Sequence, residues 1–291
     1  MSKHTPDEIE EHDLGLTHDL PRIMARRGLL GLLGGVGAAA ALTACGSDDS
    51  PSTTSTSSPT QGGPPQGAPP GGGMGGDSSV EVGEGEIPEE TAGPYPGDGS
   101  NGPNVLTESG VVRSDITGSF GSASGVAEGI PATVKLKVYD LEGDEITPLA
   151  GAAIYLWHCD RAGNYSMYDG DAVDENYLRG VQEADADGNL TFTTIFPACY
   201  AGRWPHMHFE VYKSLDAATS AENKLRTSQL ALPQDVCETV YATDGYEQSV
   251  TNLAQLSLDS DGIFSDGYSL QMAKVTGSVD DGYTVTLNIP V

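Results

Sequence analysis

The protein is a chain of 291 residues in which 42 Asp and Glu stand against 14 Lys and Arg, for a formal net charge of −28. A nucleic acid or an anionic membrane surface needs a basic binding face, so this charge argues against both as partners. The 38 Gly and 18 Pro are crowded toward the N-terminus, which leaves a shorter foldable part and favours one domain over two.

Residues 1–45 have the pattern of an export signal. An Arg pair at 26–27 precedes an apolar run over 29–41, and this order resembles a twin-arginine signal. The run is short and rich in Gly and Ala, whereas a membrane span needs about 20 strongly apolar residues. Residues 42–45, LTAC, resemble a bacterial lipobox, which predicts a lipid on Cys45 and an anchor at the outer face of the cell membrane. An ordinary export signal followed by an incidental cysteine would instead release a soluble protein.

Residues 46–87 are expected to form a disordered linker. Between positions 51 and 80, 24 of 30 residues are Gly, Pro, Ser or Thr, a composition with too little apolar surface to offset the entropy of ordering. No fixed period is present, so a structural repeat is excluded. The folded domain is therefore predicted to span residues 88–291.

Within this domain, short segments alternate apolar and polar residues with a period of two, the pattern of half-buried strands. The alternation is clear in 132–140, in 189–195 and in 285–289. Turn-forming Gly, Asp and Asn bound these segments, as is typical of a sandwich. Helical patterns are confined to 234–241 and 249–258. The sequence thus predicts an all-β sandwich with a few short helices and long loops.

Three histidines fall in the predicted domain, and two of them stand in one tripeptide. In the segment 204–212, WPHMHFEVY, the period of a strand places His206 and His208 on the same face. Such a pair is a common way to seat a metal ion, although it also occurs as simple hydrogen-bonded histidines. For His158 we expect a structural hydrogen bond, with metal ligation as the alternative.

The residues that could complete such a site are tyrosines rather than cysteines. The CxxC spacing of zinc sites is absent, and the domain's cysteines are scattered. All 12 Tyr of the chain lie in the domain. A phenolate is a hard anionic donor, and a bound cation lowers the pKa of a tyrosine well below its usual ~10. Two Tyr with two His would make a ferric site rather than a zinc or copper site.

Three blocks, 149–166, 179–188 and 192–208, resemble the intradiol ring-cleavage dioxygenases, the non-haem ferric enzymes exemplified by catechol and protocatechuate dioxygenases. The resemblance extends over about 90–241, and GPYP at 93–96 is similar to the family's entry segment. It implies the family's β-sandwich, which is transthyretin-like in topology. It also implies four ligands to a non-haem Fe(III), namely Tyr165, Tyr200, His206 and His208.

The same matching implies roles for three catalytic residues. Arg203 would stabilise the negative charge that develops on the substrate, since a guanidinium stays protonated when buried. Gln229 matches the glutamine that helps to position the bound diolate and oxygen, although an insertion around 216–224 makes this match less secure. Tyr200 would leave the metal when substrate binds and then serve as a base.

The implied activity is cleavage of a catechol-type diol by dioxygen between the two hydroxylated carbons, giving a cis,cis-muconate-type diacid. One alternative is a surface-anchored β-sandwich module that binds a metal or ligand without turnover, and another is copper or zinc storage at the His pair. Arg203 and Gln229 favour the enzyme, because retention of a metal requires neither residue.

The resemblance carries one further expectation, and position in the sequence carries another. It places Cys159 in a core strand, so Cys199 and Cys237 are the expected pair if one disulfide forms, although spacing alone does not fix the connectivity. Three residues that closely follow Tyr165 are expected near the substrate cleft, namely Tyr168, Tyr177 and Arg179.

Overall fold

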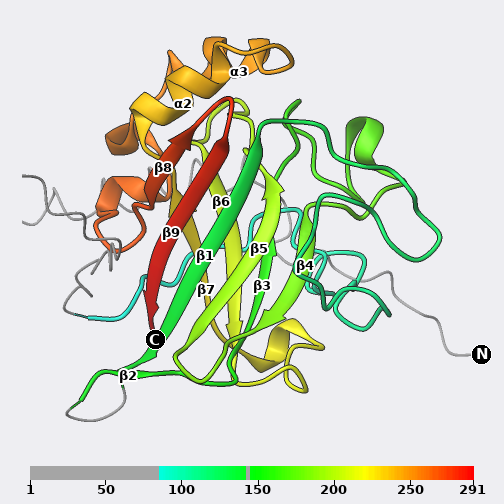
Figure 1. Ribbon diagram of the computed structural model, residues 1–291, viewed down its shortest axis with the longest axis vertical. Coiled ribbons are helices and arrows are strands. Elements are labelled where there is room, and N and C mark those ends of the chain that lie inside the picture. Colours follow the sequence, from blue (N-terminus) through cyan, green and yellow to red (C-terminus); the bar gives the residue numbers. More distant parts are fainter. Residues whose placement is uncertain (1–84, 142–144) are drawn as a thin grey trace, which may run out of the picture. The chain divides into compact units, whose positions relative to one another are not determined.

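The computed structural model describes residues 85–141 and 145–291 (Figure 1). The predicted export signal with Cys45, and nearly all of the predicted linker, lie outside these residues. Among the helices of the described ranges, none has the length and apolar character needed to cross a membrane.

The domain is a sandwich of two β-sheets, which confirms the predicted fold class. The larger sheet contains β1 (Pro131–Asp140), β2 (Thr147–Pro148), β5 (Asn189–Ile195), β8 (Lys274–Ser278) and β9 (Gly282–Pro290). Its order is β2-β1-β9-β8, and β5 also pairs with β1. The pair β1 and β9 is parallel, whereas the other pairs in this sheet are antiparallel.

The second sheet carries the predicted histidine pair. It consists of β3 (Ala153–Trp157), β4 (Arg179–Glu183), β6 (His206–Tyr212) and β7 (Lys224–Ala231). The order is β4-β3-β6-β7, and every pair is antiparallel. The register puts His208 directly between Trp157 of β3 and Gln229 of β7.

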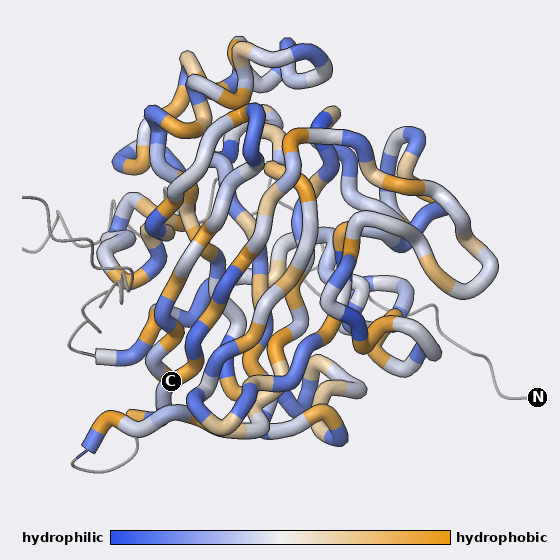
Figure 2. The backbone as a smooth tube through the Cα atoms, in the orientation of Figure 1, coloured by the Kyte–Doolittle hydropathy of each residue, from blue (hydrophilic) through white to orange (hydrophobic). Residues whose placement is uncertain are grey.

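The main core lies between the sheets and follows the predicted alternation. Val134, Leu136 and Val138 of β1 are buried against the opposing sheet, while Lys135 between them is exposed. Figure 2 shows the same alternation of hydrophobic and hydrophilic residues along β1 and β9. Burying each such side chain contributes about 1.5–3 kcal/mol, so a one-residue shift of register would be costly.

The four-stranded sheet is also covered on its other face. Val105, Leu106 and Val111, from the long segment before β1, join Tyr155 and Trp157 of β3 in a second apolar cluster. All seven residues of β6 are consequently buried. The histidines of this strand therefore lie beneath a cover of loops instead of on an open surface.

The two predicted helices are present with one shift. α2 (Gln234–Tyr241) has the predicted bounds and follows Pro233, a residue suited to a helix start. α3 (Glu247–Leu253) begins and ends before the predicted 249–258. The prediction was too long because the Ser257 hydroxyl accepts from the Ser260 amide and caps a separate 3₁₀ turn, η4 (Leu258–Ser260). Further 3₁₀ turns are η2 (Gly170–Ala172), η3 (Ala221–Asn223) and η5 (Phe264–Asp266).

The expected disulfide is absent. Cys159, Cys199 and Cys237 are all buried free thiols. The Cys199 sulfur instead lies 3.5 Å from the carbonyl oxygen of Arg203, within the loop that precedes β6. Burial raises the pKa of the Cys199 thiol to about 12, so this thiol is protonated at neutral pH.

Candidate active site

The imidazoles of His206 and His208 lie on the same face of β6 and point toward each other, as the strand period predicts. The Nδ1 atom of His206 lies 2.5 Å from the carbonyl oxygen of Trp204. Because a carbonyl only accepts, Nδ1 carries the proton and Nε2 is left with a lone pair that can accept a hydrogen bond or bind a metal. The Nε2 atoms of His206 and His208 are 3.1 Å apart. The two rings thus present nitrogen donors to the same small volume.

Both histidines are held in the neutral form that binds metals. Burial lowers the pKa of His206 well below its usual value, and the nearby Arg203 lowers it further. For His208, burial is again the main cause of a strongly lowered pKa, followed by His206 and Arg203. Neither ring is therefore expected to be protonated at neutral pH.

The two tyrosines predicted as ligands lie beside these rings. The Tyr200 hydroxyl is 3.1 Å from Nε2 of His206. The Tyr165 ring lies 5.8 Å from that of Tyr200 and 6.1 Å from that of His208, measured between centroids. A tight turn aims Tyr165, because the Asp169 carboxylate accepts from its backbone N–H at 2.5 Å. Tyr165 thus converges with three side chains of the segment 200–208.

Both phenols are neutral in the metal-free chain. Burial raises the pKa of Tyr165 well above its ordinary value, and Tyr200 adds to the effect. Burial likewise raises the pKa of Tyr200 to about 12, although Arg203 acts in the opposite direction. A metal ion that bound here as a phenolate complex would displace these protons.

The donor set fits a ferric ion. The buried hydroxyl of Tyr165 makes no hydrogen bond to the described residues, and the Nε2 atoms of His206 and His208 face each other at 3.1 Å. A cation would satisfy all of these groups. Within residues 85–141 and 145–291, no cluster of three or more His, Cys, Asp or Glu is placed to hold a metal. Tyr165 and Tyr200 are the side chains beside the histidine pair that could complete a metal site, and their oxygens would suit a hard trivalent ion.

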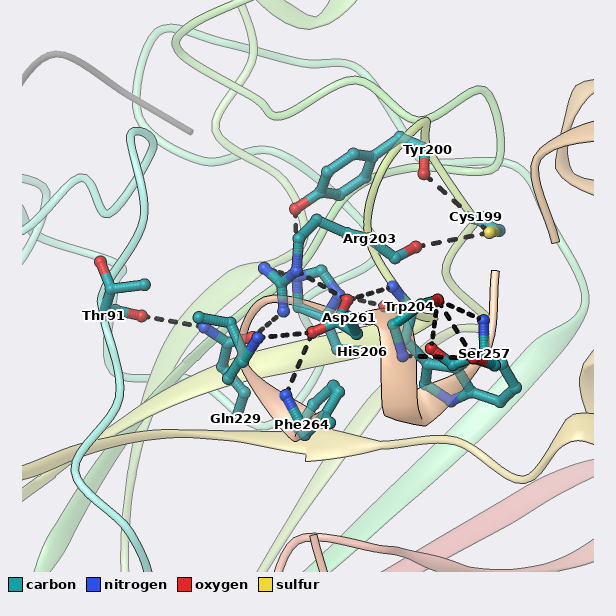
Figure 3. Close-up of polar contacts among 12 residues, drawn as sticks. Thr91, Cys199, Tyr200, Arg203, Trp204, His206, Gln229, Ser257, Asp261 and Phe264 are labelled. Carbon is teal, nitrogen blue, oxygen red and sulfur yellow. Dashed lines mark hydrogen bonds and ion pairs between the residues drawn. The ribbon is translucent and has the colours of Figure 1, made fainter. Parts of the chain in front are cut away.

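The two predicted charge-handling residues are also assembled at the site (Figure 3). Nη2 of Arg203 donates to Oε1 of Gln229 at 2.6 Å, and Nη1 lies 3.5 Å from Nε2 of His206. Gln229 is fixed in turn, since its Nε2 donates to the Thr91 carbonyl oxygen at 2.9 Å. The segment 216–224, which the resemblance marks as an insertion, forms the loop before β7, and Gln229 is in register with His208.

One residue of this assembly was missed by the sequence reasoning. The buried carboxylate of Asp261 lies 3.0 Å from Nε of Arg203. It follows η4, in a segment whose sequence resembles no functional motif. An acidic residue in a chain with 42 of them carries no signal by itself.

Of the three residues expected near the cleft, Arg179 has a structural role, while the expectation for Tyr168 and Tyr177 stays a prediction. Arg179 is fully buried and donates to Ser166 and to the carbonyl oxygen of Pro96, so it ties the turn after Tyr165 to the N-terminal segment. Tyr168 accepts from the Gly97 backbone N–H. The hydrogen bond expected of His158 is confirmed: its Nδ1 donates to the Cys159 carbonyl oxygen, and its Nε2 contacts the hydroxyl of Thr194.

Comparison with known proteins shows which sequences the chain resembles. A family model described as Dioxygenase matches residues 105–231. The chain is 38% identical over 79 residues to catechol 1,2-dioxygenase of Candida albicans, covering 26% of this chain and 25% of the relative. It is 32% identical over 92 residues to chlorocatechol 1,2-dioxygenase of Rhodococcus opacus, covering 28% and 35%. These matches span about a quarter to a third of each relative's length.

A solved structure shows the same fold. The intradiol ring-cleavage dioxygenase from Tetranychus urticae superposes with a TM-score of 0.52 at 24% sequence identity. The superposition covers 63% of this chain and 87% of that one.

Proposed function

We propose that the chain, which matches the intradiol ring-cleavage dioxygenases in sequence and fold, is an enzyme of that family and cleaves a catechol-type aromatic diol with dioxygen. The product would be a cis,cis-muconate-type diacid. A non-haem Fe(III) would be held by four residues, namely Tyr165, Tyr200, His206 and His208. The observation that carries this proposal is the convergence of two imidazole nitrogens and a Tyr200 hydroxyl within 3.1 Å contacts, beside the unpartnered hydroxyl of Tyr165.

When bound, the ferric ion supplies the chemistry that makes a catecholate reactive toward dioxygen. Among the chain's own residues, Tyr200 would take a proton from the diol once it is a tyrosinate; the position of its hydroxyl beside the His pair and Arg203 supports this role. The Arg203 guanidinium offsets the negative charge of the diolate through the Nη1 edge that faces His206. Gln229 keeps that edge in place by accepting from Nη2.

Burial of the site supports turnover in a protected space. Tyr165, His206 and His208 are nearly inaccessible to solvent, while Tyr200 and Tyr95 are half-buried. We infer that the diol enters on the side of these last two residues. Exclusion of water strengthens the interaction between Arg203 and an anionic substrate.

A binding module without turnover is the rival function. Such a module would need the four ligands but not a buried guanidinium aimed at them. Burying a guanidinium is costly, and this chain supplies two partners, Gln229 and Asp261, to hold Arg203 at the site. Metal binding alone would not require this arrangement, so it favours the enzyme.

Oxygen uptake tests the proposal directly. The full chain, reconstituted with ferric iron, is incubated with catechol, 4-methylcatechol, protocatechuate and hydroxyquinol, and oxygen consumption and ultraviolet absorbance of the diacid are followed. We expect at least one diol to be consumed with one O₂ per ring, and Tyr200→Phe to lose most of this activity. A protein that binds iron in the two-tyrosine site but consumes none of the diols would support the binding module.

We also propose that the protein is exported by the twin-arginine pathway and anchored through a lipid on Cys45. The sequence 26–45 supports this, and Cys45→Ser tests it. We expect the variant to lose incorporation of labelled fatty acid and to appear in the medium. A wild-type protein that incorporates no label would contradict the anchor.

A further inference from the structure

The carboxylate of Asp261 is the most fully engaged acidic group near the site. One oxygen, Oδ2, accepts from Nε of Arg203 at 3.0 Å and from the backbone N–H of Trp204 at 2.7 Å. The other, Oδ1, accepts from the backbone N–H groups of Ile263 and Phe264 at 2.8 and 3.2 Å. Figure 3 shows this carboxylate between the Arg203 side chain and the turn that carries Phe264. Asp261 is itself 0% exposed.

The contact with Asp261 helps to fix the orientation of the planar Arg203 guanidinium. The guanidinium of Arg203 uses Nε for Asp261 and Nη2 for Gln229, and these two anchors leave Nη1 as the edge turned to His206. Because two of its N–H groups are hydrogen-bonded, the guanidinium can neither tilt out of its plane nor rotate within it. Phe264 also packs under it, with the guanidinium carbon 5.9 Å from the ring centroid.

The anchor comes from a part of the chain beyond the matched family region. That region ends at residue 231, whereas Asp261 lies 58 residues after Arg203, between α3 and β8. The same segment returns to the sheet, because the Ala231 backbone N–H donates to the carbonyl oxygen of Gln271 and the Ala273 N–H donates to that of Ala231. The loop is therefore secured to β7 on the C-terminal side of Asp261.

We propose that Asp261 is a positioning residue: its carboxylate holds the Arg203 guanidinium so that Nη1 faces the substrate oxygens above the His pair. Asp261 does not touch the substrate or the metal. Its effect passes through Arg203, so the kinetic part of this inference rests on the proposed function. The geometric part does not, since the ion pair is formed in the metal-free chain.

The geometric part is tested first, in the metal-free protein. The Nε–H group of Arg203 is assigned in a ¹H–¹⁵N spectrum as the arginine side-chain signal lost in Arg203→Lys. We expect this signal to be shifted and protected from exchange with solvent in the wild type, and to exchange rapidly in Asp261→Asn. A matched control is Asp259→Asn, an isosteric change at an exposed position two residues away, which should leave the signal unchanged. An unprotected Arg203 signal in the wild type would overturn the inference whether or not the protein is an enzyme.

The kinetic part uses the iron-loaded protein and a double-mutant cycle. Replacing a residue that orients a group at a metal site typically lowers activity about tenfold to a hundredfold. We expect such a fall in kcat for Asp261→Asn, with iron content retained. Weaker binding of catechol under anaerobic conditions should accompany it. In an Arg203→Gln background the same substitution should change kcat by less than about twofold, because the residue it acts through is gone.

Two results would contradict the positioning role. One is loss of iron in Asp261→Asn, which would point to the contact with Trp204 and hence to the support of His206. The other is a further large fall in the Arg203→Gln background. If Asp261→Asn alone does not fold, the comparison of Arg203→Gln with the double variant still decides, because neither protein buries an unpaired guanidinium.

Discussion

The ring of Trp157 lies parallel to that of His208, at 9° between planes and 4.9 Å between centroids. Trp157 is fully buried, and it pairs with His208 across adjacent strands. The Nδ1 atom of His208 has no hydrogen-bond partner among the described residues. The orientation of this imidazole therefore depends on ring stacking, whereas that of His206 depends on a hydrogen bond to the backbone.

Replacing Trp157 should separate stacking from simple filling of space. Trp157→Phe keeps a flat surface under His208 and removes a buried indole N–H without a partner, so we expect iron content close to that of the wild type. Trp157→Ala leaves a cavity and should lower the free energy of unfolding by about 3–5 kcal/mol. Urea denaturation and iron analysis of both variants check this. Loss of iron in Trp157→Phe would show that stacking is not what positions His208.

Gly93 also lies close to the ring of His208. A Cβ at this position would lie 3.3 Å from Cε1 of His208, and the residue has a positive φ of +72°. We expect Gly93→Ala to push the ring away and weaken ferric iron binding, measured by competition with a chelator. Gly121→Ala is the control, since φ is +70° there but a Cβ would meet nothing within 4 Å. Equal effects of the two variants would assign the change to backbone strain.

We expect the hydroxyl of Tyr165 to contribute to binding of ferric iron but not to the stability of the fold. It is buried without a hydrogen-bond partner, and such a group costs about 1–3 kcal/mol. Tyr165→Phe is therefore expected to leave the metal-free protein as stable as the wild type, or more stable. The same variant should lose the visible tyrosinate charge-transfer absorption that we expect of the iron-loaded protein. Thermal unfolding and visible spectra test both statements, and a destabilised metal-free variant would contradict the first.

Glu90 should make stability depend on pH. Burial, with Asp266 as a further cause, raises the pKa of this half-buried carboxyl to about 7. Between about pH 4.5 and 7 the folded state then binds more protons than the unfolded state. The stabilisation from this group is thus full below about pH 4.5 and is lost as the pH rises through about 7. Denaturant unfolding should show a shallower decline over this range in Glu90→Gln, and an unchanged slope would rule out this role.

The strands and the histidine pair could be predicted because their signals are local. Alternation in β1, β5 and β9 follows from one buried face, and the tripeptide around Met207 places two imidazoles together through the strand period alone. The tyrosine ligands required the family resemblance, since a single Tyr carries no such pattern. Their roles stay predictions until a metal is measured.

Other features depend on contacts that span the chain. Asp261 meets Arg203 only after the loop beyond α3 folds back. Arg179 is buried because the N-terminal segment covers β3. The prediction that it lies near the cleft used only its closeness to Tyr165 in the sequence, which does not show this burial. The end of α3 was missed because Ser257 caps a new turn, which is a local signal but one that competes with a continuing helix.

The parallel pairing of β1 with β9 bears on how the domain forms. Eight residue pairs, from Ala132 with Tyr283 to Tyr139 with Pro290, join segments roughly 150 residues apart. Contacts of such long range make folding slow, because the chain must close a large loop before the pairing is gained. A ribosome must also complete nearly the whole domain before β1 meets its parallel partner. Until then that strand edge is open to other chains, so newly made protein should be most prone to aggregate before β9 has been made.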